Sequence, residues 1–223
     1  MKRLLLSALI TFLGIGCFAQ NQLYTIKGTI HDVDLNGERV DLMEFGEDTN
    51  FAIQDTRIRN NSFLFSGKID QPRLWILLIE NHKILLVVEK ADIIVDIYRD
   101  SSKVSGTKIN EDFQAFVDKS NAYRKEITEL FARYQAAPED SPEKDSLMKQ
   151  LEDMEKHWQS KVIVEFVEAN INNPAGQRAF KSVLPDLSAE ELKRIIAKVD
   201  SVSINIPYIQ RAIEQVNAAE DTP

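Results

Sequence analysis

The sequence offers almost no sulfur chemistry. Cys17 is the single cysteine among 223 residues, and it lies inside an apolar segment at the start of the chain. If that segment is cleaved after Ala19, no cysteine remains, and a chain without cysteine forms neither a disulfide nor a Cys-x-x-Cys redox site. Thiol-based catalysis is excluded for the same reason.

Motifs for catalysis and cofactor binding are also missing. The eight glycines are scattered, so no glycine-rich phosphate loop is present, and no Gly-x-Ser-x-Gly or Ser-x-x-Lys motif offers a nucleophile. The three histidines, His31, His82 and His157, have no second His or Cys at metal-ligand spacing. We therefore predict a protein with no catalytic residue, no cofactor and no enzymatic activity.

No apolar run reaches the roughly 20 residues that a membrane-spanning helix needs. The longest run extends from Leu4 to Phe18, follows the basic pair Lys2 and Arg3, and ends in small residues at Ala19. This order of positive charge, apolar segment and small residues is typical of a secretory signal peptide. We predict a signal peptide over residues 1–19, cleaved after Ala19, and therefore an exported protein.

Cys17 permits a second interpretation, in which it receives a lipid and anchors the protein to a membrane. The lipid-attachment motif has a Leu three residues before the cysteine. Here that position is Gly14, and Leu13 is one residue too far away. Lipidation of Cys17 is therefore the less favoured alternative, and we expect membrane contact only if it occurs.

The charge balance is acidic. Without Lys2 and Arg3 the chain has 25 basic and 35 acidic residues, a net charge of −10. Such a surface repels nucleic acids and anionic lipids. We expect no nucleic-acid partner.

Apolar residues alternate with polar ones through residues 23–99, which is the pattern of half-buried strands. Tyr24 and Ile26 begin one apolar face, and Asn60-Asn61 supplies residues that tolerate the positive φ of a hairpin turn. We count about seven strands, over residues 24–31, 40–45, 51–58, 62–69, 73–79, 83–88 and 92–98. This density predicts an antiparallel β-sandwich or barrel over residues 20–108.

The apolar spacing becomes helical after Gly106. We expect Asn110 to cap a first helix, and the segment 137–142 to separate it from a second, so that the two form an antiparallel αα-hairpin. Ser188 begins a capping box, and Pro207 suits the first turn of a last helix. Residues 109–223 are thus predicted to be helical, and the fold class is α+β.

One stretch resembles a metal site. Asp32, Asp34 and Asn36 lie at alternate positions before Gly37, as in the first half of a calcium-binding loop. The second half fails, because position twelve is Met43 instead of a bidentate Glu. We favour a hairpin turn with Asn36-Gly37 at positive φ between two strands, and keep calcium or small-ligand binding as an alternative.

Several short motifs resemble one known domain. They are Tyr24-Thr25-Ile26-Lys27-Gly28, Asp55-Thr56, Asn61-Ser62-Phe63-Leu64-Phe65-Ser66-Gly67, Pro72, Val104-Ser105-Gly106-Thr107 and Asn110-Glu111-Asp112-Phe113. The pattern is similar to the domain of unknown function at the N-terminus of exported thioredoxin-like proteins of the TlpA/ResA type. The resemblance implies a β-rich fold and a location in the periplasm or cell envelope of a Gram-negative bacterium. It carries over no redox residue, because the chain has no Cys-x-x-Cys.

A well-patterned core without catalytic motifs favours a non-catalytic exported envelope protein that binds or scaffolds other proteins. The expected partners are exported or outer-membrane proteins. The resemblance adds an alternative, in which the protein is an accessory to a separate thioredoxin-like thiol-disulfide oxidoreductase.

Overall fold

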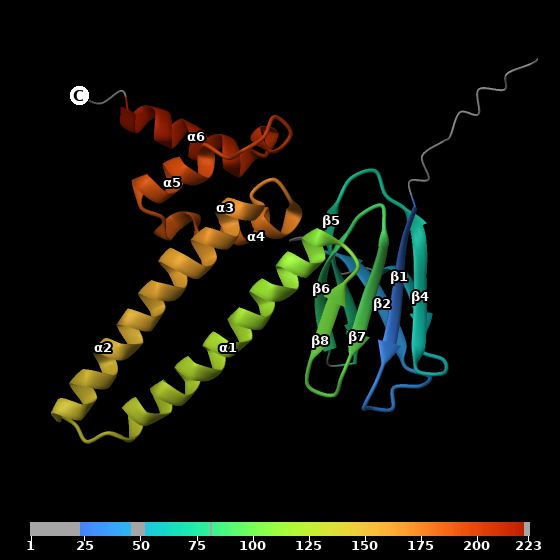
Figure 1. Cartoon of the computed structure of the whole chain (residues 1–223), viewed down its shortest axis with the longest axis horizontal. Helices are drawn as coiled ribbons and strands as arrows, with labels where there is room; N and C mark the ends of the chain where they lie inside the picture. Colours follow the sequence, from blue (N-terminus) through green and yellow to red (C-terminus); the bar gives the residue numbers. More distant parts are fainter. Residues whose placement is uncertain (1–22, 46–51, 81, 221–223) are drawn as a thin grey trace, which may run out of the picture.

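The computed structural model describes residues 23–45, 52–80 and 82–220. The predicted signal peptide and Cys17 lie outside the described residues. An N-terminal block of strands is followed by helices (Figure 1), so the predicted α+β class is confirmed. No helix within the described ranges is long and apolar enough to cross a membrane.

The strands form two four-stranded sheets, which confirms the predicted sandwich. The first sheet has the order β4 (Ser62–Lys68), β1 (Leu23–Ile30), β7 (Asp92–Ile97), β8 (Ser102–Ser105). The second has the order β3 (Ala52–Arg57), β2 (Arg39–Glu44), β5 (Arg73–Ile79), β6 (His82–Val88).

Alternating apolar residues of both sheets fill the space between them. Tyr24 and Ile26 of β1 are 1% and 0% exposed, and Leu77 of β5 is 0% exposed. Because successive strand residues point to opposite faces, the polar residues of β1 between Tyr24 and Ile30 lie on the opposite face of the first sheet. Twenty buried side chains form this one core, which is therefore the main apolar cluster of the sandwich.

Two glycines of the first sheet make room for aromatic rings. Gly28 pairs with Phe63 across β1 and β4, and Tyr24 pairs with Gly67 in the same register. A Cβ at Gly28 would lie 2.0 Å from the Phe63 ring, and one at Gly67 would lie 2.8 Å from the Tyr24 hydroxyl. These reciprocal pairs explain the spacing of glycine and aromatic residues in the two motifs.

Two details of the predicted sandwich differ from the structure. β8 is an eighth strand, missed because its four residues contain only one buried side chain, Val104. The β1–β7 pair is parallel, so the first sheet is mixed instead of fully antiparallel. Alternation reports which face of a strand is buried and contains no information on its direction.

The turns follow the predictions in one case and differ in another. Asn60 and Asn61 have φ values of 51° and 55°, and Arg59 and Ser62 exchange backbone hydrogen bonds around them, which confirms a tight turn at positive φ. The strands that this turn joins, β3 and β4, lie in different sheets. The predicted hairpin at Asn36-Gly37 is wrong, because β1 and β2 lie in different sheets. Only Gly37 of that pair has a positive φ, at 90°.

The helical region begins with α1 (Lys108–Ala136) and α2 (Pro142–His157), which pack antiparallel and confirm the αα-hairpin (Figure 1). A π-helical segment, Trp158–Ile163, joins α2 to α3 (Val164–Asn170). The distal part of the hairpin, residues 120–157, extends away from the sandwich, and we call it the arm. Its own core has three buried residues, Leu130, Ala137 and Leu147.

Three shorter helices complete the chain: α4 (Pro174–Val183), α5 (Ala189–Ile196) and α6 (Pro207–Glu220). The Ser188 capping box and the start at Pro207 are confirmed. The predicted cap of α1 is wrong, because the N-cap is Thr107, whose side chain accepts a hydrogen bond from the Asn110 backbone N–H. Asn110 has a different role at the joint between the sandwich and the helices.

Candidate functional site

The first two turns of α1 close one edge of the sandwich. Asn110 Oδ1 accepts a 2.8 Å hydrogen bond from the Val87 backbone N–H, and Asn110 Nδ2 donates one of 2.7 Å to the Val87 carbonyl. Four residues later, Gln114 accepts from the Val104 N–H at 2.7 Å and donates to the Ser102 carbonyl. The two amides thus bind backbone groups of Val87 on β6 and of Ser102 and Val104 on β8 that a neighbouring strand would otherwise bind.

Apolar packing joins the helices to the outer face of the second sheet. Leu74 of β5 and Val87 of β6 are directly paired and point away from the sandwich core. Both are buried in a second core that contains Phe113 of α1 and Phe180 of α4. Because hydrogen bonds and apolar contacts both span this joint, the position of α4 relative to the sandwich is fixed.

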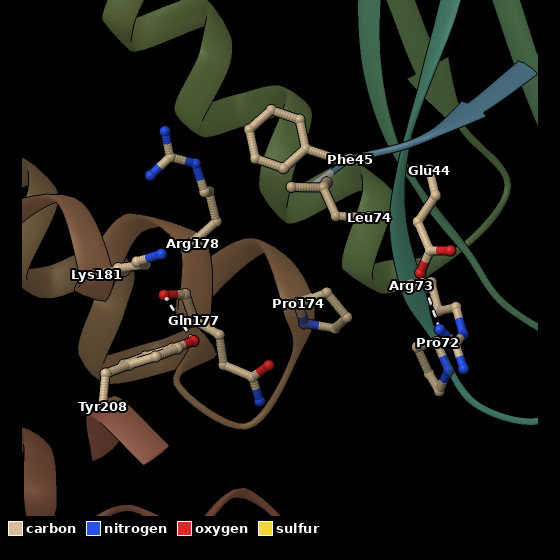
Figure 2. Close-up of a pocket in the computed structure, with 10 residues that line it drawn as sticks. All are labelled: Glu44, Phe45, Pro72, Arg73, Leu74, Pro174, Gln177, Arg178, Lys181 and Tyr208. Carbon is tan, nitrogen blue, oxygen red and sulfur yellow. Dashed lines mark hydrogen bonds and ion pairs between the residues drawn. The ribbon is translucent and has the colours of Figure 1, made fainter. Parts of the chain in front are cut away.

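An open groove of about 670 Å³ lies at this joint (Figure 2). The sandwich contributes the end of β2 and the start of β5, and the helical region contributes α4 and α6. The lining residues are Glu44, Phe45, Pro72, Arg73, Leu74, Pro174, Gln177, Arg178, Lys181 and Tyr208. Its volume lies in the range of sites that bind ligands.

The helix α4 forms one wall because its two faces differ in character. Pro174, Gln177, Arg178 and Lys181 recur at the spacing of one helical face and line the groove. The opposite face is apolar and buried. On that face Gly176 lies so close to α3 that a Cβ would be 2.0 Å from the Asn170 carbonyl oxygen.

The sandwich wall carries an ion pair that is already satisfied. Arg73 lies 2.8 Å from the Glu44 carboxylate and 3.6 Å from that of Asp70. The hydrogen bond to Glu44 raises the pKa of Arg73 above its ordinary value. Arg73 therefore orders this wall, and its charge is largely neutralised by its two acidic neighbours.

The surroundings of Arg178 differ from those of Arg73. Its guanidinium lies 5.2 Å from the centroid of the Phe45 ring, a cation–π distance, and within the described part of the chain it makes no ion pair. Tyr208 lies on the same side of the groove and donates a hydrogen bond to the Gln177 carbonyl at 3.3 Å. Burial raises the pKa of Tyr208, and the positive charge of Arg178 opposes that shift. The groove thus combines an apolar floor with an accessible cation.

The predicted metal candidates lie in one loop, away from this groove. Asp32 Oδ1 accepts a 2.7 Å hydrogen bond from the Arg99 backbone N–H, and Asp34 Oδ1 accepts two from Asn36. The bonds from Asn36 lower the pKa of Asp34. The Asn36 side chain is in turn bonded to Asn61, so these polar groups support the loop. Calcium binding there stays a prediction that calorimetric titration can test.

The histidines also lie apart from the groove. His31 Nε2 is 2.8 Å from Asp96 Oδ1, and its ring stacks on Tyr98 with centroids 4.6 Å apart. His82 begins β6 and His157 ends α2. Over the ranges that the structure describes, no group of three or more His, Cys, Asp or Glu residues is placed to hold a metal ion.

Comparison with protein families gives one match. Residues 24–113 match the model of a domain of unknown function, DUF4369. No curated protein and no solved structure gives a significant match. The DUF4369 match covers the sandwich and the first turns of α1, including Asn110 and Phe113, and it stops before the arm, α4 and α6.

The motif residues of the DUF4369 region have structural roles. Gly28 and Gly67 accommodate aromatic rings, Gly106 has a φ of 96° at the entry to α1, and Thr107 caps that helix. Asn110 completes the edge of β6. The motif residues within the matched region therefore shape the fold of this chain and hold the helix that follows.

The sequence interpretation missed the groove. Its residues come from segments far apart in the chain, and α4 was not predicted as a separate helix. Asn173-Pro174 was the available signal, because Asn is a favoured N-cap and Pro is favoured at the first helical position. In the structure the Asn173 side chain accepts hydrogen bonds from the backbone N–H groups of Ala175 and Gly176.

Proposed function

We propose that the protein is a non-catalytic binding module of the cell envelope, which holds another exported protein in the groove between its sandwich and its helices. The observation that supports this proposal is the groove itself, where Phe45 and Leu74 provide an apolar surface beside the cation of Arg178. Apolar surface gives affinity and a few placed polar groups give specificity. Among the described residues that line the groove, no nucleophile, base and oxyanion donors are assembled.

Rigidity of the joint supports this function. Asn110 is 1% exposed, and its two hydrogen bonds to Val87 lie beside the apolar contacts of Leu74 with the helical core. A preformed binding surface loses less conformational entropy when a partner binds. The sandwich therefore serves as a fixed platform for α4, in agreement with a scaffolding role.

Site-specific photo-cross-linking in the source organism tests this function. A photoreactive amino acid replaces Gln177 in the groove, and a control protein carries it at the exposed Gln135 of the arm. We expect one defined adduct from position 177 only, which disappears when unmodified protein is added in excess. Identical adducts from both positions, or none from position 177, would contradict the proposal.

The identity of the cross-linked protein distinguishes a scaffold from an accessory of a thioredoxin-like oxidoreductase. An outer-membrane or other exported protein would agree with a scaffold. A thioredoxin-like oxidoreductase would favour the redox-accessory alternative, and kinetics of that enzyme with and without the protein would then measure the effect. Mass spectrometry of the N-terminus in the same sample would show whether the chain is cleaved after Ala19 or lipidated at Cys17.

A further inference from the structure

We propose that the groove recognises an acidic, extended polypeptide segment whose carboxylate pairs with Arg178. The inference rests on the proposed binding function and specifies the chemistry of the partner. It follows from the charge of the groove, from the surroundings of Arg178 and from the open form of the site.

The groove differs in charge from the rest of the chain. The full sequence has 27 basic and 35 acidic residues, whereas the groove is lined by three cationic residues, Arg73, Arg178 and Lys181, and by one acidic residue, Glu44. An acidic protein repels acidic ligands over most of its surface. A cationic groove on such a protein therefore concentrates acidic segments at one place.

Arg178 is the cation positioned for an external carboxylate. Arg73 is already bonded to Glu44, but Arg178 lies against the face of Phe45 and is exposed to solvent. A guanidinium next to an aromatic ring keeps N–H groups at the edge of its plane, and these can pair with a carboxylate in bidentate fashion. Figure 2 shows Arg178 and Lys181 together on the α4 wall, opposite the Glu44–Arg73 pair.

The shape of the site favours a polypeptide over a small molecule. Small-molecule sites bury most of the surface of their ligand, whereas this groove is open to solvent between two walls. An extended segment places alternate side chains on opposite sides. Apolar side chains at every second position then contact Phe45, Leu74 and Pro174, and the acidic side chains between them reach Arg178.

Binding of a designed peptide to the purified protein tests the inference. The probe is a fluorescent ten-residue peptide of alternating Leu and Glu, and its control has Gln in place of Glu. Fluorescence anisotropy at low salt should show the Glu peptide binding at least about tenfold more tightly, because a charge-assisted pair replaces a neutral one. The preference should decrease as salt increases.

Two substitutions assign the preference to Arg178. Arg178→Glu should weaken binding of the Glu peptide at least about tenfold, and Arg178→Gln should reduce the preference for the Glu peptide over the Gln peptide. Arg133→Glu, the same charge change on the arm, should leave binding unchanged. Arg178 and Arg133 are both exposed, so we expect all three variants to fold, which circular dichroism checks.

Equal binding of the Glu and Gln peptides to the unmodified protein would overturn the acidic-partner inference, as would unchanged binding by Arg178→Glu. The peptide and cross-linking experiments together distinguish failure of the acidic-partner inference from failure of the proposed binding function. A saturable adduct at position 177 together with peptides that show no charge preference would leave the binding function standing and remove the acidic partner. Absence of both would remove both.

Discussion

The β-sandwich and the arm contain similar apolar side chains but bury very different numbers of them. Twenty buried residues form one core in the sandwich, whereas the core of the arm consists of Leu130, Ala137 and Leu147. Since most helix stability in proteins comes from tertiary packing, the arm is the less stable of the two. The groove lies at the joint beside the sandwich, where packing is dense.

A matched pair of substitutions should expose this difference most clearly. Leu77 in the sandwich and Leu147 in the arm are 0% and 1% exposed, so each loses the same buried atoms when changed to Ala. Leu77→Ala should lower the free energy of unfolding by about 4 kcal/mol, because the dense core cannot collapse around the cavity. Leu147→Ala should lower it by only about 1 kcal/mol and should accelerate hydrogen exchange within residues 120–157.

Denaturant unfolding measures both values on the same protein preparation. Equal losses for Leu77→Ala and Leu147→Ala would mean that the arm and the sandwich unfold as one cooperative unit, against the comparison drawn above.

A substitution at the joint between the sandwich and α1 should cause the next largest loss of stability. Asn110→Leu leaves the N–H and C=O of Val87 buried without a hydrogen-bond partner, and each such group costs about 1–3 kcal/mol. We expect a total loss of about 3 kcal/mol in urea unfolding, together with faster exchange of the Val87 amide. Asn121→Leu, at an exposed site of the same helix, should change stability by less than about 0.5 kcal/mol. Normal protection of Val87 in the Asn110 variant would contradict the proposed role of the joint.

Replacing a glycine in the sandwich should cause a smaller loss of stability, and that loss should depend on the aromatic ring that the glycine faces. Gly28→Ala brings a methyl group to 2.0 Å from the Phe63 ring, so the ring must move, at a cost of about 2 kcal/mol. Phe63→Leu removes the ring, and the double variant should therefore be more stable than the sum of the two single losses predicts. Thr29→Ala, on the outer face of the same strand, is the control. Strictly additive losses would show that the Gly28–Phe63 contact is not the cause.

The smallest loss of stability should come from removing an ion pair within the helical region. Glu168, whose side chain is 16% exposed, lies 2.7 Å from Lys198 and 2.9 Å from Arg194. The hydrogen bonds from Lys198 and Arg194 lower the pKa of Glu168. Because both cations are about half exposed, Glu168→Gln should cost only about 1 kcal/mol at pH 7.

The pH dependence of that loss follows from the direction of the shift. A lowered pKa in the folded state contributes stability above the unfolded value of about 4.3, and this contribution disappears as the pH falls through the folded pKa. The difference between the unmodified protein and Glu168→Gln should therefore be largest near neutral pH and vanish in acid. Glu165→Gln, at an exposed neighbouring position, is the control. A difference that persists below the folded pKa would contradict the ion-pair explanation.

The sequence predicted the layers of the fold better than their connections. Alternation located β1 and β4 because one face of each strand is buried, a continuous apolar run located β5, and apolar helical spacing located α1 and α2. Strand direction could not be read from alternation, which is why the parallel β1–β7 pair was missed. The cap of α1 was misassigned because Asn favours both N-caps and buried hydrogen bonds to backbone, and only the structure shows that the Asn110 side chain reaches Val87.

The groove could not be predicted because no local pattern defines it. Phe45 follows a strand and Arg178 lies on the polar face of a short helix, and each is ordinary in its own segment. Their contact depends on how α4 docks on the outer face of the second sheet, through Leu74 and Phe180. By contrast, the short motif at residues 32–36 suggested a metal site. In the structure Asp34 is bonded to Asn36 of the same loop, and Asp32 is bonded to the backbone of Arg99.

Hydrogen exchange of the full chain, with and without the protein captured at position 177, tests the binding account most directly. We predict slower exchange in residues 174–181 and in Arg73 and Leu74 when the partner is bound, with no change in the arm. Protection confined to residues 120–157, or no protection anywhere, would contradict the assignment of the groove as the binding site.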